Sequence, residues 1–119
     1  AEKIIAKILF GRKINKKTGK LKDIDTVFTI WKKAKVNAFV ELKNVKLFLK
    51  KKKIFYLDWV GPDKNSFYKK KIELASGDTT SVLASSISIS SNKRDPGSYK
   101  LKVYLFNELI SEKSFTLVK

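Results

Sequence analysis

The sequence contains no cysteine and no histidine among its 119 residues, and only two prolines and five glycines. Without cysteine the chain has no disulfide framework and no thiolate nucleophile, which leaves its redox compartment open and is compatible with export. Without histidine, a serine–histidine–aspartate triad and a zinc site with the usual ligands are both excluded. The sequence therefore gives no sign of an enzyme, and we expect no cofactor, no metal and no small-molecule substrate.

Long hydrophobic runs are also absent, since no apolar stretch approaches the ~20 residues of a membrane span. Hydrophobic residues nevertheless make up 43% of the chain and aromatic residues 12%, which is too apolar for a disordered protein. A chain of this length is typical of one folded unit. We therefore expect residues 1–119 to form a single soluble domain.

The apolar residues follow a period of two along most of the chain, as in half-buried β-strands. Alternating or β-prone segments cover residues 3–11, 27–30, 36–42, 54–60, 67–74, 81–90, 99–106 and 109–118. Turn residues separate them, and the polar stretch 12–22 reads as a long loop. The pattern predicts an all-β protein, an antiparallel sandwich of seven to eight strands in the immunoglobulin-like class.

One predicted hairpin joins residues 54–60 to 67–74 through a turn that contains Gly61, Pro62 and Asp63. Pairing Phe55 with Ile72 and pairing Ile54 with Ile72 both bring apolar side chains together. A slip of one residue exchanges the two faces of a strand, so the sequence leaves this register open.

The segment Asp95-Pro96-Gly97-Ser98-Tyr99, followed by Leu101, resembles the Asp-x-Gly-x-Tyr-x-Cys motif of immunoglobulin-like domains. The resemblance implies that Tyr99 forms a tyrosine corner, with its hydroxyl bonded to backbone a few residues upstream. Leu101 stands in the cysteine position, so aliphatic packing replaces the family's disulfide.

The same resemblance assigns the remaining core positions of the family to this chain. Trp59 takes the place of the core tryptophan, and Val40 or Ala38 takes the place of the other cysteine. Val40, Trp59, Tyr99 and Leu101 are thus the expected structural core. The spacing from Val40 to Trp59 is longer than the family norm.

A second resemblance runs from residue 7 to residue 28 and includes Trp59 and Pro62-Asp63 further on. These residues are similar to those of bacterial extracytoplasmic immunoglobulin-like modules, which commonly act as interaction domains. The resemblance implies a location in the periplasm or cell envelope and a protein partner.

The remaining polar side chains offer few candidates for a catalytic or metal site. Asp23 and Asp25 lie two apart and point the same way on an extended segment, but two carboxylates supply too few oxygens for Ca²⁺. Asp58, beside Trp59, is expected on the outward face of its strand, paired with a lysine. A serine–lysine pair in the serine-rich segment 85–91 is strongly disfavoured.

Positive charge is in large excess, with 27 basic residues against 11 acidic ones and a net charge of +16. Residues 1–71 hold 21 of the basic residues and 6 of the acidic ones. Two clusters flank the predicted hairpin and are the candidate polyanion-binding residues: Lys50, Lys51, Lys52, Lys53, Lys69, Lys70 and Lys71. Against this function, 25 of the 27 basic residues are lysine, whereas phosphate recognition favours arginine. Lysine on edge strands also prevents pairing between molecules.

Two functions follow from these observations. The first is a non-catalytic interaction module, exported or associated with the envelope of a bacterium, that contacts another protein. The alternative is a basic domain that binds a polyanion, either nucleic acid or an anionic membrane surface. The partner's identity and the oligomeric state stay open.

Overall fold

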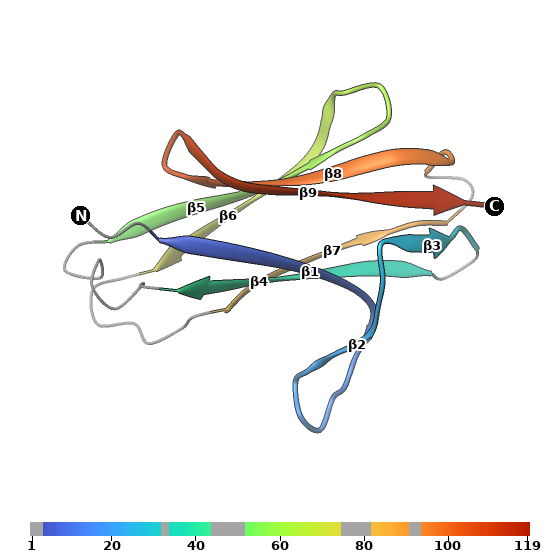
Figure 1. The fold of residues 1–119 in the computed structure, drawn as a ribbon, viewed down its shortest axis with the longest axis horizontal. Helices are drawn as coiled ribbons and strands as arrows, with labels where there is room; N and C mark the ends of the chain where they lie inside the picture. Colours follow the sequence, from blue (N-terminus) through green and yellow to red (C-terminus); the bar gives the residue numbers. More distant parts are fainter. Residues whose placement is uncertain (1–3, 32–33, 44–51, 75–81, 91–93) are drawn as a thin grey trace.

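The computed structural model describes residues 4–31, 34–43, 52–74, 82–90 and 94–119, which form two β-sheets packed face to face (Figure 1). The strands are β1 (Ile5–Ile14), β2 (Leu21–Ile24), β3 (Val27–Thr29), β4 (Lys35–Lys43), β5 (Lys53–Val60), β6 (Ser66–Leu74), β7 (Val82–Ser88), β8 (Gly97–Leu105) and β9 (Glu108–Val118). One sheet has the order β2-β1-β4-β7 and the other the order β3-β9-β8-β5-β6. No helix in these ranges is long and apolar enough to cross a membrane.

Neighbouring strands pair antiparallel throughout, with the exception of the short parallel pair β3 and β9. Strand β1 changes partner along its length. Its first part pairs with β4 as far as Gly11, and its last part pairs with β2. Residues 12–22 are therefore not one long loop, because β1 continues to Ile14 and β2 begins at Leu21.

The loop prediction failed at residues 12–22 because this hairpin leaves the sandwich. Its side chains have no core to face, so the alternation of apolar and polar residues that marks the other strands is missing. Figure 1 shows the β1–β2 hairpin projecting from the body of the molecule.

The core lies between the two sheets and takes one side chain of every two from each long strand. Phe10 of β1, Trp59 of β5 and Phe115 of β9 meet near its centre. Their ring centroids are 4.8 to 6.3 Å apart in tilted or edge-on arrangements, which aromatic pairs prefer. Burying each such side chain contributes about 1.5–3 kcal/mol, so this cluster is a large part of what holds the sheets together.

The register of the β5–β6 hairpin is now determined, because Phe55 lies opposite Ile72. A register shift between Trp59 and Val60 marks a bulge close to the turn. Gly77 and Asp78, whose residue types favour a turn after the strand predicted at residues 67–74, lie outside the described residues.

Candidate functional site

The four expected core residues, Val40, Trp59, Tyr99 and Leu101, are all buried. Trp59 lies directly opposite Leu101 in the pair β5 and β8, as the resemblance implies for the tryptophan and the cysteine position. Ala38 is fully buried as well, so both candidates for the partner position on β4 face the core.

A hydrogen bond between the sheets accompanies Trp59, and sequence reasoning missed it. The indole Nε1–H donates to Ser85 Oγ at 3.0 Å, and Ser85 lies on β7 in the opposite sheet. A buried indole N–H without a partner is costly, and Ser85 provides that partner. Ser85 alternates along β7 with Leu83 and Ile87, which are buried on the same face. This alternation is the sequence signal that could have predicted that Ser85 faces the core.

Tyr99 forms the corner that its motif predicts. Its hydroxyl donates to the Asp95 carbonyl oxygen at 2.7 Å, and its ring stacks on Phe115 with centroids 5.4 Å apart. Burial raises the pKa of Tyr99 above its ordinary value of 10.0, because the phenolate form loses hydration.

Asp58 departs in part from its prediction. It does lie on the outward-facing side of β5, with Lys69 and Lys102 as cross-strand neighbours, but only 7% of it is exposed. The Ser66 hydroxyl donates to the Asp58 carboxylate, so this carboxylate is bound by a hydroxyl group instead of the expected lysine ammonium group. The turn after Val60 brings Ser66 beside Asp58. Because the two residues lie on different strands, the pattern within one strand does not predict this contact.

Of the two neighbouring acids, Asp23 lies on β2, and Asp25 has a structural role in the β2–β3 connection. Asp25 accepts hydrogen bonds from the backbone N–H groups of Thr26 and Val27 and lies 3.8 Å from Arg12. These backbone bonds, more than the arginine, hold the pKa of Asp25 below its usual value. Within the described ranges no three acidic, cysteine or histidine side chains are grouped to hold a metal ion.

The described lysines of the two clusters do not all lie on one face of the sheet. Lys50 and Lys51 lie outside the described residues. Within β6, Lys69 and Lys71 are the cross-strand partners of Asp58 and Tyr56, and all four side chains lie on the outer face of the sheet. Lys70 lies on the inner face, reaches the other sheet and donates to the Ala84 carbonyl oxygen at 2.9 Å.

Acidic and aromatic neighbours accompany the other cluster lysines. Glu73 lies 3.1 Å from Lys71 and 3.7 Å from Lys52, and the hydrogen bond from Lys71 is the main cause of the lowered pKa of Glu73. Lys53 lies over the Phe106 ring, 5.9 Å from its centroid. The ion pairs with Glu73 compensate part of the positive charge of these clusters.

Two rows of side chains cross the outer face of the five-stranded sheet, because cross-strand partners share a face. The first, which we call the aromatic row, consists of Lys71, Tyr56, Tyr104 and Leu109 on β6, β5, β8 and β9. The second, the charged row, consists of Lys69, Asp58, Lys102 and Glu112 on the same four strands. The charged row thus alternates in sign across the sheet.

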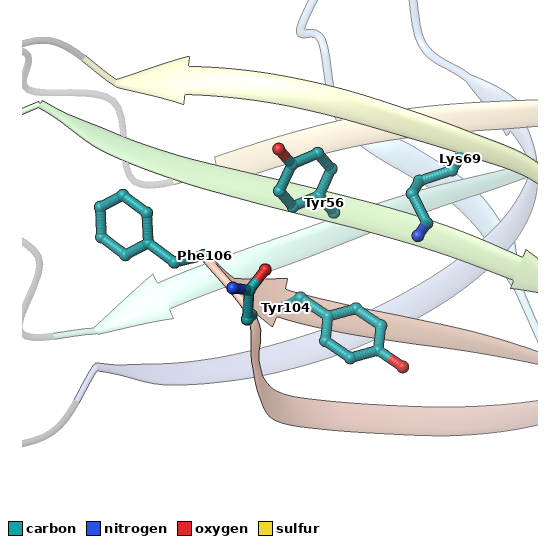
Figure 2. Close-up of a pocket in the computed structure, with 5 residues that line it drawn as sticks. Tyr56, Lys69, Tyr104 and Phe106 are labelled. Carbon is teal, nitrogen blue, oxygen red and sulfur yellow. The ribbon is translucent and has the colours of Figure 1, made fainter.

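A shallow depression of about 420 Å³ lies along these rows, lined by Tyr56, Lys69, Tyr104, Phe106 and Asn107. Figure 2 shows the two tyrosines and Phe106 gathered over β5 and the end of β8, with Lys69 approaching from β6. The Lys69 ammonium lies 5.9 Å from the Tyr56 ring centroid. Phe106 and Leu109 are each 44% exposed, so this face offers apolar surface to solvent.

No protein-family model and no curated protein sequence matches this chain. Its structure is similar to that of an immunoglobulin-like protein from Pseudomonas aeruginosa, with a TM-score of 0.61 and 14% identity over 98% of both chains. It is also similar to part of the alkylpurine DNA glycosylase AlkC from Pseudomonas fluorescens, solved with DNA containing an abasic site analogue. That similarity has a TM-score of 0.50 and 14% identity, and it covers 98% of this chain but 30% of the glycosylase.

At these identities the likeness concerns the fold alone, and it agrees with the two-sheet topology. The predicted fold class is confirmed: the chain is an all-β, immunoglobulin-like sandwich without a disulfide. The described residues form nine strands instead of the expected seven to eight, because β2 begins in the stretch predicted to be a loop.

Proposed function

We propose that this protein is a non-catalytic interaction module that binds another protein through the outer face of its five-stranded sheet. The aromatic row carries the proposal, because tyrosine and other aromatic residues are enriched where protein surfaces are buried by a partner. An antiparallel sheet with one face on the core normally turns polar residues outward, so Tyr56, Tyr104 and Leu109 in line are unusual there.

The charged row favours a protein over a polyanion at this face. Lys69 and Lys102 flank Asp58, and Glu112 follows, so positive and negative groups alternate over the width of four strands. A phosphate backbone gains from a positive stripe and is repelled by carboxylates within it. A protein surface of mixed charge can complement an alternating row.

The lack of histidine and cysteine supports a non-catalytic role, because the common nucleophile–base pairs depend on them. Two of the carboxylates, Asp58 and Asp25, are engaged by Ser66 and by backbone N–H groups. An extracytoplasmic bacterial location is part of the proposal and rests on the sequence resemblance alone. Protease protection of the protein in its host cells would test it.

Site-specific photocrosslinking in the host tests the protein partner. A photoreactive amino acid replaces Leu109 in the aromatic row, and a matched control replaces the exposed Ser86 on β7 of the other sheet. We expect a discrete adduct to a second protein from position 109 and none from position 86. Equal labelling from both positions would contradict the proposal, and an adduct between two copies of this chain would replace it by self-association.

Binding of the purified partner gives the second measurement. Tyr56→Ala or Tyr104→Ala should weaken it by about 2 kcal/mol, roughly thirtyfold in Kd, if these rings are the centre of the interface. Trp31→Ala, remote from this sheet face, is the control and should leave the affinity unchanged.

A further inference from the structure

The β1–β2 hairpin has a structure of its own outside the sandwich core. It projects away from the body of the sandwich (Figure 1), and the turn at its tip is held by Asn15. The Asn15 N–H donates to the Lys20 carbonyl at 2.8 Å, and its side-chain oxygen accepts from the Lys17 N–H at 2.9 Å. A projecting element ordered in this way presents fixed groups to whatever it meets.

The hairpin concentrates cationic side chains that have few acidic partners. Its six cationic residues are Arg12, Lys13, Lys16, Lys17, Lys20 and Lys22. Arg12 has Asp25 at 3.8 Å. Among the residues that the structure describes, no carboxylate lies within ion-pair distance of the other five, in contrast to Lys52 and Lys71 beside Glu73.

Exposed apolar side chains accompany these cations. Trp31 is 63% exposed, and Ile14, Ile24 and Val27 are exposed as well. Trp31 also lines a depression of about 240 Å³ together with Arg12 and Lys13. Apolar and cationic groups therefore occur together at the end of the sandwich that carries the hairpin.

We infer that the basic hairpin and Trp31 form a site for an anionic membrane surface. Lysine ammonium groups are drawn to anionic headgroups, while tryptophan and aliphatic side chains partition into the interface just below them. A single-stranded nucleic acid would use the same cations and could stack on Trp31, but it has no corresponding use for Ile14, Ile24 and Val27. This site is separate from the aromatic row. The membrane inference and the proposed protein-binding function can therefore be disproved independently of each other.

Cosedimentation with vesicles tests the electrostatic part. Vesicles containing about 30% phosphatidylglycerol are compared with pure phosphatidylcholine at low and at raised NaCl. The test variant reverses Lys16, Lys17 and Lys20 to Glu, and the matched control reverses the exposed Lys7, Lys43 and Lys64 to Glu, so both have the same net charge.

The wild type should bind only the anionic vesicles and should release them as salt rises. Each lysine near the surface is worth roughly fivefold in affinity, so the hairpin variant should lose on the order of a hundredfold. The control should bind nearly as the wild type does. No binding at low salt, or equal losses in both variants, would overturn the inference.

Tryptophan fluorescence tests the apolar part, because Trp59 is fully buried and Trp31 is the exposed one. We expect anionic vesicles to shift the emission to the blue and brominated lipids to quench it, and both effects to vanish in Trp31→Phe. Quenching of Trp31 by oligothymidylate at concentrations below those needed for vesicles, without response to brominated lipid, would overturn the membrane assignment in favour of a nucleic acid.

Discussion

At the scale of single residues, Trp59 combines packing with a polar contact. Its ring contacts Phe10 and Phe115, and its indole N–H reaches Ser85 on the other sheet. The side chain thus joins β1, β5, β7 and β9 at one point. Few residues of this protein have partners on so many strands, which makes Trp59 the natural test of the core.

Replacing Trp59 by Ala should lower the free energy of unfolding by about 3–5 kcal/mol, because a large cavity forms and Ser85 loses its donor. Urea denaturation followed by circular dichroism measures the loss. Trp31→Ala is the matched control and should change stability by less than about 0.5 kcal/mol, since most of that side chain is in solvent. Similar effects of the two substitutions would contradict the role assigned to Trp59.

Tyr99 gives a prediction that depends on pH. Tyr99→Phe removes the hydrogen bond to Asp95 and should cost about 0.5–1.5 kcal/mol at neutral pH. Because burial raises the pKa of Tyr99 in the folded state, the unfolded chain loses this proton first as pH rises. The contribution is complete below the unfolded pKa near 10 and is lost as pH rises through the folded pKa.

The measurement is the difference in unfolding free energy between the wild type and Tyr99→Phe as a function of pH. It should be constant from pH 7 to about 9 and shrink above about 10. The lysines titrate in both proteins and largely cancel in the difference. A difference that grows with alkaline pH would argue against the buried, hydrogen-bonded tyrosine.

At the scale of elements, the edges of the two sheets are tied by lysines. Lys70 of β6 donates to the Ala84 carbonyl on β7, and Lys113 of β9 donates to the Ile8 carbonyl on β1 at 3.2 Å. Each bond occupies an edge carbonyl of the opposite sheet, where an open edge would invite pairing with another molecule. Part of the lysine excess is therefore used inside the molecule.

Lys70→Met keeps an apolar stem but removes the bond to Ala84. We expect a loss of about 0.5–1.5 kcal/mol and more concentration-dependent association, measured by urea denaturation and light scattering. Lys69→Met, one position away on the other face, serves as the control and should show neither effect. Identical behaviour of the two variants would mean that Lys70 does not protect the edge strand β7 from pairing with another molecule.

Gly11 lies where β1 passes from β4 to β2. A Cβ atom there would come within 2.5 Å of the Lys22 carbonyl oxygen and 2.6 Å of Leu21 Cγ. Gly11→Ala should therefore force the base of the hairpin apart, with a cost of about 1–3 kcal/mol in thermal or urea unfolding. A neutral substitution would show that the hairpin can shift freely at its base.

At the scale of the whole molecule, the net charge of +16 opposes the compact state. The four ion pairs found among the described residues are all exposed, and pairs of that kind contribute little. Repulsion between lysines thus outweighs the compensation that these pairs provide.

Raising NaCl from about 10 mM to about 150 mM shortens the Debye length from about 30 Å to about 8 Å, against a longest dimension of 45 Å. The urea midpoint should rise with salt, because screening relieves the repulsion. The variant with Lys16, Lys17 and Lys20 changed to Glu should show a weaker salt dependence. A midpoint that falls with salt would mean that the exposed ion pairs dominate.

The sequence by itself determined where most strands lie and which apolar side chains face the core on the strands with clear alternation. Alternation along a strand is local, so the inward residues around Leu101 could be assigned without knowing their partners, whereas the burial of Trp59 was implied by the family resemblance. The corner at Tyr99 was also predictable, since its hydroxyl reaches only four residues back.

Only the tertiary structure decided which outward side chains meet. The aromatic row joins Tyr56, Tyr104 and Leu109 through registers between strands far apart in sequence, and outward residues carry no core pattern that reveals these registers. The same holds for the separation of Lys70 from Lys69 and Lys71, and for the path of β1 into a projecting hairpin. The core follows from local periodicity, whereas the candidate binding surfaces depend on pairing across the sheets.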